Sequence, residues 1–226
     1  MSSNLSVVFI GATGAVGGHA SASLSTHPDV AKLTLIGRRE ATHLSSEKVA
    51  QHVADLSDPT SYREVLQGHD TAVCTLGIGQ PSKVSREEFE RVDHDYVLDF
   101  AKACKAAGVR HFALLSSVGA DAGSSNYYLR TKGRLEEELA ALEFDRLSVF
   151  RPSMILTPTN RYGFSQAVAL RLTPLLKPLL MGPLRKFRGV PVDLLGRAIA
   201  ASVLQPGGRV ETHYWDDFNA LLRQTN

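Results

Sequence analysis

The chain has 226 residues, of which 43% are hydrophobic and 21% charged, and this composition is that of an ordinary globular protein. Because an α/β sheet of this length can fold around one core, we expect residues 1–226 to form a single domain. Lysine and arginine total 25 against 23 acidic residues, so the net charge of +2 gives no reason to expect a nucleic acid or an anionic membrane as a partner.

Short apolar runs alternate with helical patterns along the first two thirds of the chain. The expected strands span residues 5–10, 32–36, 48–53, 71–75, 112–115 and 147–150. The expected helices span residues 16–27, 60–67, 86–107 and 127–142. This alternation is typical of a parallel sheet covered by helices on both faces. The sequence therefore predicts a Rossmann-like, doubly wound α/β fold.

The pattern loosens after Pro152, where prolines recur among short helical fragments. We interpret residues of about 153–192 as a small C-terminal cap on the substrate side of the sheet, not as an independent domain. Beyond it we expect a helix at 193–204, a possible strand at 210–214 and a final helix at 216–223.

Several features bear on compartment and metal content. The first residues contain neither a basic segment nor a small-residue cleavage site, so we expect no secretory signal, and no apolar stretch is long enough to span a bilayer. Cys74 and Cys104 lack metal-type spacing, and two isolated thiols are typical of core residues in a protein of the reducing cytoplasm. The eight histidines show no paired ligand spacing, so the sequence predicts no metal site, and it predicts His94 and His111 at the surface or its boundary.

The first expected strand runs directly into a turn with the spacing Gly-x-x-Gly-x-x-Gly, formed by Gly11, Gly14 and Gly17. Glycines here let a strand turn tightly into a helix, whose free N-terminal amides can bind a pyrophosphate. The signal is strong because the turn lies between an expected strand and an expected helix. The predicted dinucleotide contacts in this turn are Gly11, Thr13, Gly14, Ala15, Val16 and Gly17.

The second expected strand is followed by Arg38 and Arg39. A site that prefers NAD places a carboxylate at this point, where it binds the ribose hydroxyls. Two guanidinium groups instead suit the 2′-phosphate of NADP(H), which a carboxylate would repel. The sequence therefore predicts NADP(H) as the cofactor, with two solvated surface arginines as the alternative.

A more specific pattern follows the fifth expected strand. Ser116 and Ser117 end that strand, and Tyr128 and Lys132 form a Tyr-x-x-x-Lys motif on the next helix. At 100° per residue, this tyrosine and lysine lie within about 40° of the same helix face. The order and spacing resemble the serine and Tyr-x-x-x-Lys site of the short-chain dehydrogenase/reductase superfamily. Residues of about 7–152 closely resemble one atypical, NADPH-binding branch of it, the Tat-interacting oxidoreductase-like family.

The resemblance implies a role for each of these residues. Tyr128 would act as general acid/base, because the ammonium of Lys132 favours the phenolate and lowers a pKa that is normally about 10. Lys132 would also bind the nicotinamide ribose, and Ser117, with Ser116 as the second choice, would orient the substrate carbonyl. Many active relatives carry an asparagine on the preceding helix, where this chain has Asp93, so the resemblance supports cofactor binding more firmly than turnover.

The resemblance also implies further cofactor contacts. Asp55, followed by Leu56, would contact the adenine edge, although a helix N-cap is an equal alternative for this carboxylate. Leu76 and Gly77 would let the cofactor pass close to the backbone. Pro152 and Met154 would lie beside the nicotinamide.

Three functions compete at this point. The first is an NADP(H)-dependent oxidoreductase that acts on a small carbonyl compound or alcohol. The second is a non-catalytic NADPH-binding protein that regulates or reports redox state through a protein partner. The third, a nucleotide-sugar epimerase or dehydratase, ranks last because the segment after Pro152 leaves little room for a nucleotide-sugar domain.

Overall fold

The computed structural model describes residues 4–157 and 180–224 and contains a seven-stranded sheet in which neighbouring strands are parallel. The strand order is β3-β2-β1-β4-β5-β6-β9. The strands are β1 (Leu5–Ile10), β2 (Val30–Gly37), β3 (Val49–Val53), β4 (Thr71–Cys74), β5 (His111–Leu115), β6 (Arg146–Phe150) and β9 (Val210–His213). The Rossmann-like, doubly wound sheet that the sequence predicts is confirmed.

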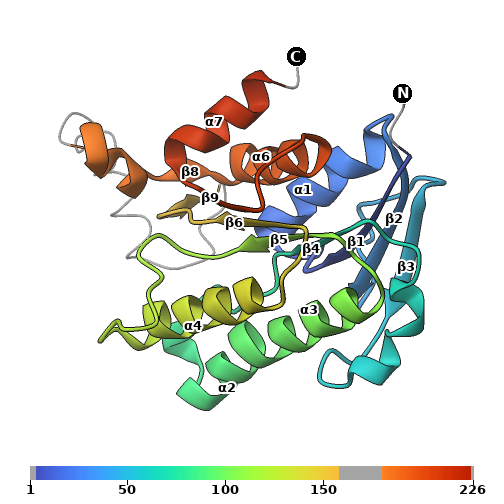
Figure 1. Ribbon diagram of the computed structural model, residues 1–226, viewed down its shortest axis with the longest axis horizontal. Coiled ribbons are helices and arrows are strands. Elements are labelled where there is room, and N and C mark those ends of the chain that lie inside the picture. The colour runs from blue at the N-terminus through green and yellow to red at the C-terminus, as the bar shows by residue number, and fades with distance from the viewer. Residues whose placement is uncertain (1–3, 158–179, 225–226) are drawn as a thin grey trace.

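Helices cover both faces of this sheet (Figure 1). One face carries α1 (Ala15–Thr26), α6 (Val192–Leu204) and α7 (Trp215–Arg223). The other face carries α2 (Arg86–Glu90), α3 (Tyr96–Ala106) and α4 (Tyr127–Ala141). Each helix buries one side, as α3 does with Val97, Phe100, Ala101 and Cys104, whose spacing of three and four residues makes a single apolar stripe.

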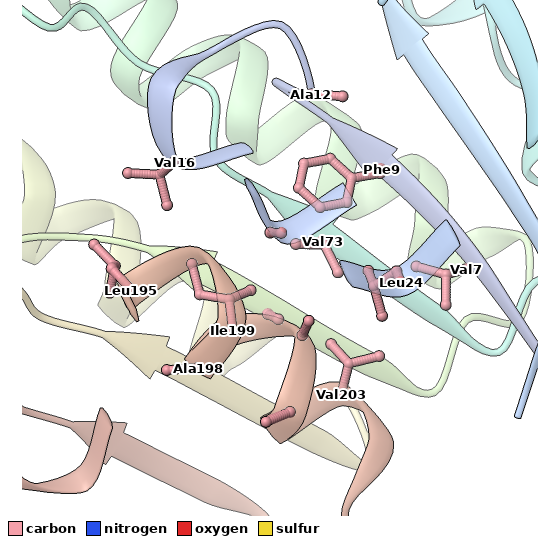
Figure 2. Close-up of a cluster of buried hydrophobic side chains, with 14 of the residues drawn as sticks. Val7, Phe9, Ala12, Val16, Leu24, Val73, Leu195, Ala198, Ile199 and Val203 are labelled. Carbon is pink, nitrogen blue, oxygen red and sulfur yellow. The ribbon is translucent and has the colours of Figure 1, made fainter. Parts of the chain in front are cut away.

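A hydrophobic core lies between the sheet and the helix pair α1 and α6. Phe9 and Val73 of the sheet meet Leu24 of α1 and Ile199 of α6 there (Figure 2). The two helices approach closely at Gly196 of α6. A Cβ atom at this glycine would lie 2.5 Å from His19 Cβ and 2.9 Å from Val16 O, both on α1. The contact therefore requires a residue without a side chain.

Gly196→Ala is expected to lower the free energy of unfolding by about 1–3 kcal/mol, because the added methyl group must push α6 away from α1. Gly208→Ala is the matched control, since its Cβ would meet only the Glu211 side chain, at 3.6 Å. Urea unfolding followed by circular dichroism measures both variants. Equal stability of the two variants would contradict the close packing of α1 on α6.

Two expected helices differ in form from the prediction. Residues 60–67 contain two 3₁₀ turns, η1 (Pro59–Ser61) and η2 (Glu64–Leu66), in place of one α-helix. The long helix at 86–107 is interrupted by the π-helical segment η4 (Arg91–Asp95), in which the N–H of Tyr96 donates to the carbonyl of Arg91, five residues earlier. The hydrophobic pattern of a sequence does not reveal that a single helical turn is wider than its neighbours. Such turns are frequent at functional sites.

Outside the main sheet, β7 (Ile155–Leu156) pairs with β8 (Val190–Pro191), and two further 3₁₀ segments are η3 (Pro81–Lys83) and η5 (Gly182–Phe187). Most of the expected cap at 153–192 lies outside the described residues, so the cap stays a prediction. Among the helices of residues 4–157 and 180–224, none has the length and apolar character needed to cross a membrane.

Candidate functional site

The glycine turn lies at the carboxyl end of β1, where the strand order reverses between β1 and β4. Gly11 has a φ of +95°, and a Cβ atom at Gly17 would lie 2.1 Å from Gly11 O, so neither position accepts a side chain. Helix α1 starts after Gly14 with no side-chain cap and no acidic residue in its first turn. Its first amides and the positive end of its dipole are therefore available to an anion, which fits a pyrophosphate.

A pocket of about 390 Å³ lies on one side of this turn. Arg38 and Arg39, both exposed, line it together with Glu40. The other predicted contacts in its wall are Gly11, Thr13, Leu56 and Leu76. The two guanidinium groups thus stand beside a hollow that the end of a dinucleotide could enter.

Asp55 is not part of the described wall of this pocket. Its carboxylate instead accepts hydrogen bonds from Ser57 Oγ at 2.7 Å and Ser57 N at 2.9 Å. These bonds hold the pKa of Asp55 below its usual value. Of the two sequence alternatives, the geometry resembles the local turn-capping role more than the adenine contact.

A larger cleft, with a volume of about 840 Å³, lies on the other side of the turn. The predicted site residues that line it are Gly14, Ala15, Val16, Gly17, Leu76, Gly77, Tyr128, Lys132 and Met154. Pro152 and Ser117 are not among the described residues of its wall. Leu76 lines both the smaller pocket and the larger cleft, so the two adjoin at the glycine turn. One dinucleotide that binds across the turn needs such an arrangement.

Lys132 and Asp93 form a buried ion pair inside this cleft. The Nζ–Oδ1 distance is 2.9 Å, and the two side chains are 5% and 3% exposed. Asp93 Oδ2 also accepts a hydrogen bond of 2.6 Å from the amide of Ile78, so the carboxylate joins η4, α4 and the loop after β4. Burial alone lowers the pKa of Lys132, but the Asp93 carboxylate and the Tyr128 hydroxyl raise it, and the net direction is upward. Lys132 is therefore protonated, and the Asp93 carboxylate neutralises its charge.

The two adjacent tyrosines of α4 have different surroundings. Tyr128 lines the cleft and packs its ring on Phe89 of α2, with centroids 5.5 Å apart. The hydroxyl of Tyr127 lies 2.7 Å from Arg86 O and 2.9 Å from Glu90 Oε2, outside the described wall of the cleft. Of the two, Tyr128 is the one that shares the cleft with Lys132.

Ser116 lines the cleft, so it is better placed for the motif serine than Ser117, the first choice from the sequence. Its hydroxyl donates to Glu136, which in turn binds Arg151 through both carboxylate oxygens. Arg151 Nη1 donates to the hydroxyl of Tyr214 at 3.1 Å. This chain of hydrogen bonds fixes the Ser116 side chain from behind the cleft.

His94 and His111 are 4% and 7% exposed, so the prediction that they lie at the surface or its boundary is wrong. The His94 ring contacts Asp95 Oδ1 at 2.9 Å and Glu138 Oε1 at 3.2 Å, and His111 Nε2 contacts Ser148 Oγ at 2.9 Å. Burial lowers the pKa of His111 to about 3. Polar partners make this burial possible, and two of them, Glu138 and Ser148, come from distant segments that the local sequence does not reveal.

Cys74 and Cys104 are fully buried, as predicted for core thiols. Burial raises the pKa of Cys74 to about 12, and it raises the pKa of Cys104 well above its usual value. Reactive cysteines lie in partly exposed, electropositive places. Neither thiol has such surroundings.

A comparison with protein families agrees with this geometry. A family model described as NAD(P)H-binding matches residues 11–167, a range that begins at the glycine turn and contains Asp93, Ser116, Tyr128 and Lys132. The chain belongs to this family. Membership confirms a nicotinamide dinucleotide as the type of cofactor for this chain.

Curated relatives point the same way. Protein HTATIP2 of Rattus norvegicus is 43% identical over 155 residues, which cover 68% of this chain and 64% of the rat protein, so the match spans less than two thirds of that relative. Protein fmp52, mitochondrial, of Emericella nidulans is 34% identical over 168 residues and 72% of each chain. The resemblance to the Tat-interacting oxidoreductase-like family is confirmed. The name of the fungal protein places it in mitochondria, so a cytoplasmic location of this chain stays a prediction.

Solved structures share the fold of this NAD(P)H-binding chain. MoeE5 in complex with UDP-glucose and NAD superposes with a TM-score of 0.70 at 17% identity, over 92% of this chain and 74% of that one. A short-chain dehydrogenase/reductase superfamily protein from Agrobacterium tumefaciens with bound NAD gives a TM-score of 0.69 at 15% identity, over 96% and 81%. At these identities the likeness shows the fold alone, a Rossmann-like sheet covered by helices.

Glu136 and the loop at 78–83 were not predicted as parts of the site. A signal for Glu136 was present, because Tyr128, Lys132 and Glu136 follow one another at four-residue intervals on one helix face. The loop carries no such signal. Its place in the wall depends on the neighbours of β4 in the sheet.

Proposed function

We propose that this chain is an NADP(H)-dependent oxidoreductase, a single nucleotide-binding domain that interconverts a small carbonyl compound and its alcohol. The observation that carries the proposal is that Tyr128, Lys132 and Ser116 line the same cleft as the free N-terminus of α1. Bound there, NADPH would supply the hydride for the carbonyl carbon and leave as NADP⁺.

The residues of the cleft supply the proton and the positioning. Tyr128 donates its hydroxyl proton to the carbonyl oxygen as the alcohol forms, regains a proton from water, and accepts the proton in the reverse direction. Lys132, kept protonated beside Asp93, hydrogen-bonds the ribose and stabilises negative charge on the phenol oxygen. Ser116 donates its hydroxyl proton to Glu136, so its oxygen can accept a hydrogen bond from the hydroxyl of the alcohol form.

The test is loss of NADPH absorbance when purified protein is mixed with a broad panel of aldehydes and ketones, together with calorimetric titration of NADPH and NADH. We expect turnover of at least one carbonyl compound, and we expect NADPH to bind more tightly than NADH. Tight NADPH binding with no turnover across the panel would overturn the catalytic part of the proposal.

Substitution of both Arg38 and Arg39 by alanine is expected to weaken NADPH binding about 150-fold or more, because two charged hydrogen bonds to a phosphate are lost and each is worth roughly 1.5–3 kcal/mol. NADH lacks the 2′-phosphate, so its affinity is expected to stay nearly the same. Arg110→Ala is the matched control, since Arg110 is exposed, binds Asp70 and is not part of either described pocket wall. A wild-type preference for NADH, or equal losses for both nucleotides, would contradict the role of the arginine pair.

A second candidate function is a non-catalytic NADPH-binding regulator that reports redox state to a protein partner. The ion pair between Lys132 and Asp93 favours it, because the carboxylate offsets the positive charge that would otherwise promote ionisation of Tyr128. This function predicts tight NADPH binding, no turnover on the carbonyl panel, and a partner that binds only the NADPH-loaded protein.

A further inference from the structure

Among the described residues, one positive charge in the wall of the large cleft has no counter-charge. Among the described residues, the charged side chains that line the cleft are Lys83, Asp93 and Lys132. Asp93 and Lys132 neutralise each other at 2.9 Å. Lys83 forms no ion pair with any carboxylate of residues 4–157 and 180–224. The cleft therefore has an excess of positive charge at Lys83.

Lys83 is presented to the cleft by a short turn. Segment η3 starts at Pro81, whose ring restricts the backbone, and the amide of Lys83 donates to Gln80 O at 3.0 Å. Lys83 is exposed, so its ammonium can reach a ligand that enters from solvent. Met154, 40% exposed, adds an apolar part to the same wall. An apolar wall with one well-placed charged group is the usual form of a site for a small polar ligand.

The sequence from residue 146 to residue 192, part of which lines the cleft, also lacks negative charge. From Arg146 to Val192 the chain contains no aspartate and no glutamate, while it contains basic residues at 146, 151, 161, 171, 177, 185, 186 and 188. Ser153, Met154 and Ile155 of this stretch line the cleft. The stretch therefore brings no carboxylate that could neutralise Lys83 or repel an anionic ligand.

We propose that the substrate of this cleft is a carbonyl compound that also carries a carboxylate, and that Lys83 binds this carboxylate. The inference rests on the proposed oxidoreductase function, whose substrate class it specifies. A lysine binds an anion as a point charge on a flexible stem, which suits a single carboxylate. Phosphate groups are more often held by arginine forks or by helix N-termini, and here those features belong to the two halves of the cofactor site.

Lys83→Gln tests the proposal, and Lys186→Gln is the matched control, because Lys186 is an exposed lysine of η5 outside the described wall of the cleft. Calorimetry measures the binding of benzoate and of its neutral counterpart benzamide, neither of which NADP⁺ can oxidise at this site, to each protein saturated with NADP⁺. Wild type and Lys186→Gln are expected to bind benzoate about fivefold more tightly than benzamide, as for one partly exposed ion pair. The preference should approach unity in Lys83→Gln and should decrease with added salt.

A second measurement compares 4-carboxybenzaldehyde with benzaldehyde as substrates. The ratio of their kcat/KM values is expected to be about fivefold in wild type and about one in Lys83→Gln. Equal benzoate affinities in wild type and Lys83→Gln overturn the proposal, as does an unchanged aldehyde ratio. Weaker NADPH binding by Lys83→Gln also overturns it, because the lysine would then belong to the cofactor site. Lys83-dependent benzoate binding without reduction of either aldehyde supports the carboxylate site and overturns the reaction.

Discussion

Tyr128→Phe is expected to lower NADPH-dependent turnover about a hundred- to ten-thousandfold, the range typical of a lost general acid/base. The ring of Tyr128 packs on Phe89, and phenylalanine keeps this contact. The variant should therefore fold and bind NADPH as the wild type does, so that the loss appears in kcat. Steady-state kinetics with the best carbonyl substrate measure turnover, and calorimetry measures the affinity for NADPH.

Tyr127→Phe is the control for this experiment. Its hydroxyl binds α2 at Arg86 and Glu90, and Tyr127 is not part of the described wall of the cleft, so we expect nearly unchanged turnover. Wild-type turnover by Tyr128→Phe would exclude this tyrosine as the proton donor. An equal loss in both variants would show that the effect comes from the packing of α4 on α2.

Asp93→Ala is expected to lower the free energy of unfolding by about 3–5 kcal/mol, the usual cost of leaving one partner of a buried ion pair unpaired. The side chains of Asp93 and Lys132 are 3% and 5% exposed, so the ion pair is largely withdrawn from water. The substitution also removes the acceptor for the amide of Ile78. Urea unfolding of wild type and variant gives the difference.

Two further variants separate charge from packing. Asp93→Asn keeps an acceptor for Ile78, so its loss should be smaller, and Asp93→Ala combined with Lys132→Met should regain most of the stability because no charge is left buried. A loss within about 0.5 kcal/mol for Asp93→Ala, as for an ordinary surface substitution, would contradict the structural role of the pair.

The difference in unfolding free energy between wild type and Asp93→Ala depends on pH through the titration of Lys132. Asp93 raises the pKa of Lys132 above its usual 10.5, although burial opposes the change. The stabilisation is then fully present below pH 10.5 and is lost as the pH rises through the raised pKa. The deficit of Asp93→Ala should therefore be largest at neutral pH and smaller in strongly alkaline solution.

Features that depend on neighbours in the chain were predictable from the sequence. The glycine turn requires only its own residues between a strand and a helix, and the four-residue spacing of Tyr128 and Lys132 places them on one helix face. The alternation of strands and helices gave the fold class for the same reason. Each of these signals is local.

Features that depend on distant segments were not predictable. Asp93 contacts Lys132 from within the π-helical turn Arg91–Asp95, which a 3.6-residue pattern does not show. The choice between Ser116 and Ser117 depends on which of two adjacent side chains faces the cleft at the end of β5. The burial of His111 depends on Ser148, a partner 37 residues away.

The burial of Cys74 and Cys104 limits how this protein can respond to oxidative stress. These are the only two cysteines in the sequence, and hydrogen peroxide attacks the exposed thiolate form, which burial disfavours at both positions. Cellular oxidation would therefore have to act on this protein by a route other than its thiols.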